Sequence, residues 1–318
     1  MVILTIEDEN EILAIAPFVY SKHTLFKFGK LKRISFMGSP ESDYNVFIIK
    51  KKKLEFLELI FDYLTENVDW NQLELKDIPA SSSSFDILHK IPLKKHYTHW
   101  EERQNTPCPY LPLPTSMDLF MKSLSHNMRH NLRRYSRRLE KNHRVELKNF
   151  DEIGSVKETM DIFFKLHQKR WNMKGELGVF NESLLRNFHT DVAKCFAEKG
   201  WLRLHFLTVD DEPVAAKYAF KYNQKVYFYL SGWDPNYSQY MVGNLAHKYE
   251  IAECIREGLI EYDLMRGNEA YKRKWATKTR KNVEISFARE GLSPRIHSWL
   301  INSNLATFAF FRLGIKLA

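Results

Sequence analysis

Residues 226–275, VYFYLSGWDPNYSQYMVGNLAHKYEIAECIREGLIEYDLMRGNEAYKRKW, decide the fold that we expect. An aromatic strand is predicted at Val226–Trp233 and a helix from Gly243 to Gly258. A second strand, at Leu259–Leu264, leads into a polar turn that contains Arg266-Gly267-Asn268. Because binding groups tend to lie on loops beyond strand ends, this turn is a candidate ligand-binding segment.

The start of the helix at Gly243 is a candidate site for an anion. The first turn of a helix leaves backbone N–H groups unpaired and carries a partial positive charge, so a pyrophosphate fits there. Val242, Gly243 and Asn244 would supply these groups. A single glycine at a helix start is weak evidence alone, but the flanking strands and the Tyr271-Lys272 pair strengthen it.

The segment before this stretch completes the pattern of a mixed α/β domain. Two helices are expected at Ile153–Met173 and Glu182–Lys199. Three strands follow, at Trp201–Val209, Val214–Tyr222 and Val226–Trp233. The short polar connections between these strands have the composition of tight turns, so the strands should be antiparallel neighbours.

Three groups of residues carry a resemblance to a known family. They are Tyr262–Leu264 with Arg266–Glu269, Tyr271-Lys272 and Trp275; Ser125–Arg138 (SHNMRHNLRRYSRR); and Lys169–Trp171 with Gly178 and Phe180. Together they resemble the GNAT acyltransferase superfamily, and more narrowly its cellulose-biosynthesis-type (CelD-like) acetyltransferase domain, a relative of the Fem-type peptidyltransferases. The turn from Gln239 to Asn244 departs from the usual pattern, since it has one glycine and no upstream arginine. Fem-type relatives use an aminoacyl-tRNA donor instead of acyl-CoA.

The resemblance, which covers roughly residues 35–290, implies a mixed α/β (α+β) fold with a GNAT-like core in the C-terminal part. The N-terminal part resembles a partial, shortened GNAT-like unit that opens with a hairpin pattern at Val2–Tyr20. The segment Pro107–Pro114 holds four prolines in eight residues and cannot be helical, so we take it as a domain boundary. The expected divisions are an N-terminal domain at 1–112, an acyltransferase domain at 113–290 and an amphipathic tail at 291–318.

The resemblance and the residue chemistry together single out candidate catalytic residues. Lys272 would stabilise an oxyanion or hold a donor phosphate, and Tyr229 would donate a proton. The candidates for binding the donor are Ser231, Val242, Gly243, Asn244, Arg266 and Asn268. The alternatives remain that Lys272 is a solvated surface lysine and that Tyr229 belongs to the core.

A long basic helix is expected at Ser116–Asn142. Nine basic and two acidic residues lie between positions 119 and 148, in a chain whose net charge is +9. Arg129, Arg133 and Arg137 recur every four residues, and such a row can follow a phosphate chain or simply form a solvated face. The substrate-binding candidates are Arg129, Arg133, Arg170 and Trp171. His126 and His130 have a spacing that suits a metal, but no third ligand accompanies them, so we expect no metal site.

Composition limits the cellular setting that we expect. The three cysteines (Cys108, Cys195 and Cys254) are far apart, which favours free thiols in a reducing compartment. The N-terminus lacks the pattern of a signal peptide, and the apolar stretch Trp299–Phe311 is too short to span a bilayer. We therefore expect a cytoplasmic protein without an integral membrane segment, whose tail can touch a membrane peripherally.

Three functions remain open from the sequence. The first is an acyltransferase that moves an acyl group, most simply acetyl, from acyl-CoA to an amine or hydroxyl of a small-molecule, sugar or peptide acceptor. It needs acyl-CoA as a co-substrate and no permanently bound cofactor. The second is a Fem-type peptidyltransferase that uses aminoacyl-tRNA, which the basic helix favours. The third is a non-enzymatic protein that binds nucleic acid or a membrane surface.

Overall fold

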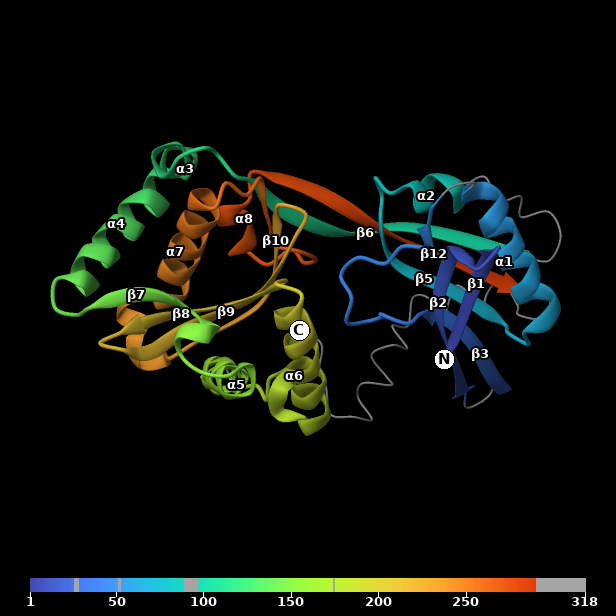
Figure 1. The fold of residues 1–318 in the computed structure, drawn as a ribbon, viewed down its shortest axis with the longest axis horizontal. Coiled ribbons are helices and arrows are strands. Elements are labelled where there is room, and N and C mark those ends of the chain that lie inside the picture. Colours follow the sequence, from blue (N-terminus) through green and yellow to red (C-terminus); the bar gives the residue numbers. More distant parts are fainter. Residues whose placement is uncertain (26–28, 51–52, 89–96, 174, 290–318) are drawn as a thin grey trace. The chain divides into compact units, whose positions relative to one another are not determined.

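The computed structural model describes residues 1–25, 29–50, 53–88, 97–173 and 175–289. These residues form two compact units (Figure 1). Among the described residues, unit 1 consists of Met1–Cys108 and residues 280–289, and unit 2 consists of Pro109–Thr279. Two strands, β6 (Tyr97–Pro112) and β12 (Lys278–Arg289), have residues in both units. No helix among the described residues is long and apolar enough to cross a bilayer.

Unit 1 is a sheet with a helix packed on it. The strands run in the order β1–β2–β3–β5–β12, and the short β4 pairs with β2. The elements that precede β6 are β1 (Val2–Asp8), β2 (Glu11–Leu25), β3 (Gly29–Phe36), β4 (Ile48–Ile49), α1 (Lys53–Asn67), β5 (Gln72–Pro79) and α2 (Ser83–Leu88). The buried side chains of α1, such as Leu57 and Leu64, pack with strand residues such as Phe18 and Leu73. The expected N-terminal hairpin is present as the antiparallel pair β1 and β2.

The last strand of the chain pairs inside unit 1. Residues Asn282–Ala288 of β12 lie antiparallel to Pro79–Gln72 of β5. The compact units consequently divide at 108/109 and 279/280, whereas the sequence pattern suggested divisions at 112 and 290. Strand pairing between distant segments explains the difference, because a local pattern does not reveal which sheet a strand joins. The tail expected at 291–318 lies outside the described residues.

Unit 2 has a mixed sheet in the order β11–β10–β9–β8–β7, with β6 paired to β11. The strands are β7 (Val145–Asn149), β8 (Leu202–Val209), β9 (Glu212–Tyr222), β10 (Lys225–Trp233) and β11 (Glu261–Asp263). β7 to β10 are antiparallel neighbours, and β11 runs parallel to β10. The turn residues Asp210, Asp211, Asn223 and Gln224 all have positive φ, which suits two-residue hairpins. The predicted mixed α/β fold is thus confirmed.

Helices cover both faces of this sheet (Figure 1). The helices α5 (Val156–Asn172) and α6 (Ser183–Glu198) pack on one face, around Phe163, Phe206 and Tyr218. On the other face lie α4 (His126–Glu140) and α7 (Val242–Arg256). The helix that the sequence predicted from Gly243 to Gly258 is α7, which begins at Val242 and ends at Arg256.

The long helix predicted at Ser116–Asn142 is wrong, because the chain forms two helices there. α3 (Met117–Ser123) ends at Leu124, whose backbone is extended with φ −75° and ψ 152°. Ser125 then caps α4 by accepting a hydrogen bond from the Met128 backbone N–H at 3.3 Å. A serine cap starts a new helix efficiently, and the apolar spacing that suggested one helix continues across the break.

Candidate functional site

The edge of β10 that faces β11 is open along most of its length. β10 pairs with β11 only at Lys225, Val226 and Tyr227, whereas β10 continues to Trp233. The register against β9 shifts between Phe228 and Leu230, which makes a bulge at Tyr229. Among the described residues, no strand pairs with this edge beyond Tyr227. The backbone there can accept an extended ligand.

The chain then turns from β10 into the start of α7. Asp234 caps a short helical segment, η3 (Pro235–Tyr240), and Met241 adopts left-handed backbone angles, φ 52° and ψ 41°. Gly243 and Asn244 follow in the first turn of α7 and are partly exposed, whereas Val242 is buried. A Cβ on Gly243 would come within 3.2 Å of the Trp233 ring, so glycine fits this close packing. The Asn244 N–H already donates to the Met241 carbonyl at 2.8 Å, so the partly exposed Gly243 presents the N–H group of this turn that remains for a ligand.

A buried lysine lies under the same turn. The Lys217 side chain on β9 is 1% exposed, and its ammonium group donates a hydrogen bond to the Gly243 carbonyl at 3.1 Å. Its Nζ also lies 5.2 Å from the centre of the Phe228 ring. Burial, reinforced by Arg170, lowers the pKa of Lys217 well below the ordinary lysine value. Such a group favours an anion nearby, because an anion would stabilise its charged form.

Arg170 and Ser231 lie together at the end of β10. The Arg170 guanidinium donates to the Ser231 carbonyl and to the Ser231 hydroxyl, each at 3.3 Å. The neighbouring Lys169 forms an ion pair of 2.5 Å with Asp234. Two of the predicted residues, one assigned to the acceptor and one to the donor, are thus in direct contact.

The close approach of α5 to β10 makes this contact possible. A Cβ on Gly232 would come within 2.3 Å of the His167 backbone nitrogen, so only glycine lets the helix lie this near. On the same helix, Trp171 donates from Nε1 to His167 Nε2 at 2.9 Å and packs against Gly178. Trp171 is therefore partly occupied in packing.

Tyr229 lies on the face of the unit 2 sheet that α5 and α6 cover. We call it the aromatic face, because most of its buried side chains are rings. Its ring centre is 5.4 Å from that of His189 and 5.9 Å from that of Tyr218. α7 packs on the opposite face (Figure 1). The bulge nevertheless places the Tyr229 backbone where β10 separates from β11.

The turn after β11 folds around Lys272. Lys272 is 5% exposed at the start of the short α8 (Lys272–Trp275), and its ammonium group donates to the Arg266 carbonyl. It also lies 3.2 Å from the Glu269 carboxylate. Asn268 accepts a hydrogen bond from Arg273 at 3.2 Å. The lysine is therefore neither solvated nor directed into open space, and it holds its own turn together.

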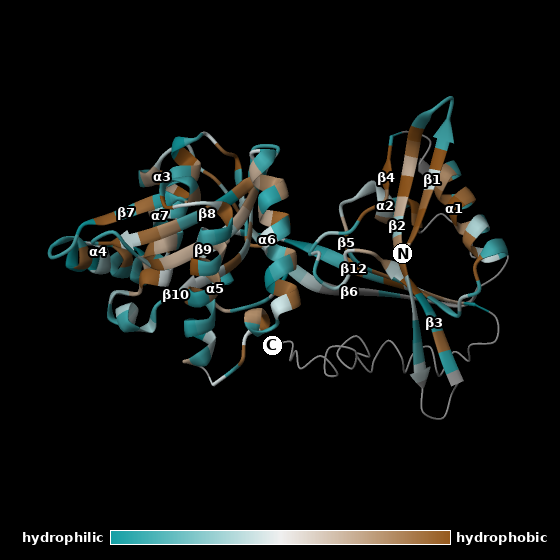
Figure 2. Cartoon of the chain, turned by 60° about the horizontal axis from the view of Figure 1, so that its bottom comes forward, coloured by the Kyte–Doolittle hydropathy of each residue, from teal (hydrophilic) through white to brown (hydrophobic). Residues whose placement is uncertain are grey.

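Two of the predicted basic residues, Arg129 and Arg133, belong to α4, whose ribbon carries many hydrophilic residues (Figure 2). Arg133 is exposed and Arg129 is partly exposed, and neither forms an ion pair within the described part of the chain. The His126 and His130 rings are 6.4 Å apart. No group of three or more possible metal ligands occurs in the residues that the structure describes.

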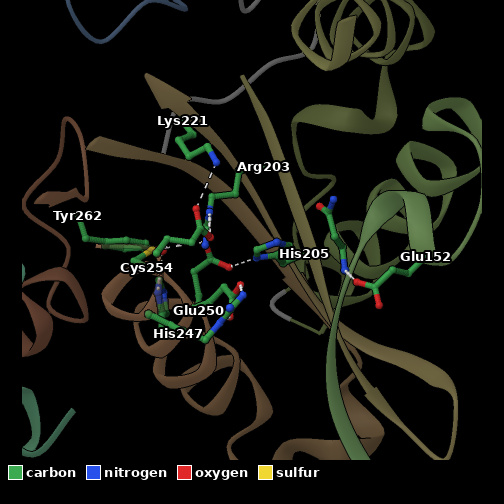
Figure 3. Close-up of polar contacts among 12 residues, drawn as sticks. Glu152, Arg203, His205, Lys221, His247, Glu250, Cys254 and Tyr262 are labelled. Carbon is green, nitrogen blue, oxygen red and sulfur yellow. Dashed lines mark hydrogen bonds and ion pairs between the residues drawn. The ribbon is translucent and has the colours of Figure 1, made fainter. Parts of the chain in front are cut away.

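A buried ionic network fixes α7 to the sheet (Figure 3). The Glu250 carboxylate lies 2.5 Å from both Arg203 Nε and His205 Nδ1. Burial acts to raise the pKa of Glu250, but His205 and Arg203 outweigh it and lower the pKa to about 2. Arg203 also pairs with Glu257, which binds Lys221. Because the network is enclosed, we assign it to structure rather than to chemistry.

The sequence did not single out Lys217 and Gly232. Lys217 interrupts an otherwise apolar strand, Val214–Phe220, and a lysine on a buried strand is a signal for a buried charge. Gly232 lies inside a predicted strand, where glycine often marks the close approach of another segment. The sequence therefore contains a sign of a buried charge at Lys217 and of a close approach at Gly232, but neither sign identifies a ligand.

Comparisons with known proteins agree with this geometry. Residues 126–273 match the family model described as an acetyltransferase (GNAT) domain. No match was found among curated proteins.

The solved structures that are similar include the crystal structure of FemX, with a TM-score of 0.63, 11% identity and coverage of 89% of this chain and 87% of that one. The C-terminal domain of a putative lysylphosphatidylglycerol synthetase from Agrobacterium fabrum has a TM-score of 0.56, 8% identity and coverage of 95% and 88%. A conserved protein of unknown function from Bacteroides thetaiotaomicron has a TM-score of 0.52 and 14% identity, and the match covers 87% of this chain and 86% of that one.

At these identities the solved structures show the fold alone. The family model matches the segment that runs from α4 to the turn at Lys272. This segment includes the open edge of β10 and the start of α7. Residues 126–273 of this chain therefore match a GNAT acetyltransferase domain, and the fold around them is that of GNAT and Fem-type structures.

Proposed function

We propose that this protein transfers an acyl group from acyl-CoA to an amine or hydroxyl acceptor. The observation that carries the proposal is the open edge of β10 beyond Tyr227, which leads directly to the accessible first turn of α7. An extended thioester donor can bond to the strand edge while its pyrophosphate binds at Val242–Asn244. The acceptor attacks the thioester carbonyl, the carbon–sulfur bond breaks, the CoA thiolate takes a proton from Tyr229, and the proton that the acceptor loses returns to Tyr229 through solvent.

The remaining predicted residues take roles in this reaction. Ser231 would bond the acyl carbonyl, held in place by Arg170. Tyr229 would donate a proton to the leaving thiolate from the bulge of β10. Lys272, with Arg266 and Asn268 in the same turn, would contact the donor once the turn exchanges its present hydrogen bonds. The acceptor would bind at Arg170 and Trp171 on the α5 face of the sheet, and Arg129 and Arg133, on α4 at the opposite face, would contact an acceptor that extends beyond the sheet.

A second candidate is transfer of an aminoacyl group from aminoacyl-tRNA. The likeness to FemX extends over most of both chains, and α4 presents a basic face that suits a polyanion. Binding of this kind should weaken steeply with added salt.

A thermal-shift comparison separates the two candidates. Acyl-CoA at about 100 times its dissociation constant should stabilise the fold by roughly 2.7 kcal/mol. Stabilisation by acetyl-CoA or a longer acyl-CoA supports the first function. Stabilisation by charged tRNA, with no shift for any acyl-CoA, would replace it with the second.

A further inference from the structure

We propose that Arg138 of α4 binds the phosphate-rich end of the donor, and this inference rests on the proposed use of acyl-CoA. It assigns to α4 the positive charge that the turn Gln239–Asn244 does not supply from its own sequence. Arg138 is thereby a residue that determines donor specificity, since it would contact phosphate groups and not the acyl chain.

The position of Arg138 is fixed next to the start of α7. Its guanidinium lies 5.2 Å from the centre of the Tyr240 ring. Tyr240 ends η3, and only Met241 separates it from α7. A guanidinium stacked on an aromatic ring keeps its N–H groups in the ring plane available for an anion.

α4 is held against α7 on both sides of this residue. The Lys248 ammonium group donates to the Ser136 hydroxyl at 2.7 Å, and the Tyr249 hydroxyl donates to Glu140. Ser136 and Glu140 flank Arg138 on α4, so the guanidinium cannot move far from the start of α7. The site is thus preorganised before a donor arrives.

The guanidinium of Arg138 has no carboxylate partner within the described residues, whereas other basic side chains in the same part of the chain have one. Asp210 pairs with His143, and Asp211 pairs with both Arg144 and Lys148. Within the described residues, Arg138 has no ion pair. Lys217, buried beneath the same turn and without an ion pair there, adds a second basic group at Gly243. Two basic groups therefore lie at one helix start, neither of them in an ion pair within the described residues, and such a pair is complementary to an anionic ligand.

Calorimetric titration with CoA tests this inference. The Arg138→Ala variant should bind CoA about tenfold more weakly than the parent protein, because charge-assisted hydrogen bonds to phosphate are lost. Lys157→Ala, which removes an exposed positive charge from α5, is the matched control and should stay within about twofold. Acetyl-pantetheine, which lacks the nucleotide and its phosphates, should bind the parent and Arg138→Ala equally.

Each outcome decides a different point. If the parent binds CoA and Arg138→Ala binds it equally well, the role of Arg138 is wrong and the proposed function stands. If Arg138→Ala weakens CoA and acetyl-pantetheine alike, the residue acts on the fold of the site and not on phosphate. If the parent binds no CoA or acyl-CoA, the proposed function itself fails. Melting temperatures within about 2 °C of the parent would confirm that the variants are folded.

Discussion

The two faces of the unit 2 sheet bury different chemistry. Under α5 and α6 the buried groups are mostly rings, among them Phe163, Phe180 and Tyr218, with two histidines inserted between them. Under α7 the buried groups include charges, among them Arg203 and Glu250. One helix layer is therefore held mainly by apolar packing and the other by an ionic network as well.

This difference indicates that an anion would bind on the face that α7 covers. A face that already organises basic groups around the start of α7 can stabilise phosphates without further rearrangement. The aromatic face contributes rigidity, because α5 lies against β10 through Gly232 and places Arg170 at Ser231. Three changes test the comparison.

The largest effect is expected for Glu250→Ala on the charged face. Arg203 and His205 would remain buried without their shared carboxylate, and breaking a buried pair in this way costs about 3–5 kcal/mol of unfolding free energy. Urea denaturation measures the loss. Arg256→Ala on the same helix breaks only an exposed pair with Glu253 and should cost less than about 1 kcal/mol. Equal small losses for both variants would contradict a structural role for the network.

An intermediate effect is expected from acid on the aromatic face. Burial lowers the pKa of His189 to about 4, and burial together with Arg170 and His189 lowers the pKa of His167 to about 3. Below about pH 6.5 the unfolded chain binds protons at both histidines, whereas the folded state does not until near pH 4, so stability falls as pH falls through this range. For the two histidines together we expect the unfolding free energy to fall by roughly 3 kcal/mol between pH 6.5 and 5.

The variant His189→Phe isolates this contribution. Phenylalanine fits the surrounding rings and does not titrate, so the decrease in unfolding free energy between pH 6.5 and 5 should become smaller. Urea denaturation at several pH values measures it. A pH dependence unchanged by the substitution would show that His189 is not the group that takes up the proton.

The smallest effect is expected for Lys217→Met. Methionine has a similar volume, and replacing a buried basic group by an apolar one is often neutral or slightly stabilising, so the unfolding free energy should change by less than about 1 kcal/mol. Denaturant midpoints with an unchanged slope would measure this. A loss above about 2 kcal/mol would mean that the Gly243 contact serves stability, which would remove Lys217 from the argument for an anion.

Local pattern sufficed for most of unit 2. The strand at Val226–Trp233, the hairpin turns at 210–211 and 223–224, and the helix after Gly243 all follow from residue type and spacing. The break at Leu124 was missed because apolar residues keep their spacing across it, and the competing signal was a single serine cap. A helix cap involves only a few residues, so a prediction that relies on apolar spacing over a long segment easily misses it.

The candidate site depended on contacts that no local pattern contains. The sequence singled out Arg170 and Ser231 separately, but their hydrogen bond requires the close approach at Gly232. Lys272 was expected to stabilise an oxyanion or hold a donor phosphate, yet its partners are the Arg266 carbonyl and Glu269 of its own turn. Arg138 received no role of its own from the sequence, because its distinguishing neighbour, Tyr240, lies about 100 positions away in the sequence.

The pairing of β12 with β5 has a consequence for synthesis on the ribosome. Unit 1 needs residues up to Ala288, although its other strands are complete by Cys108. At a translation rate of about 5–20 residues per second, synthesis of the roughly 200 residues between β5 and β12 takes on the order of 10–40 s. The whole of unit 2 is synthesised during this time. During that interval one edge of the first sheet is exposed to other nascent chains. We therefore expect chaperone binding to ribosome-bound chains to be strongest at β5 and to cease once residues 282–288 have left the exit tunnel.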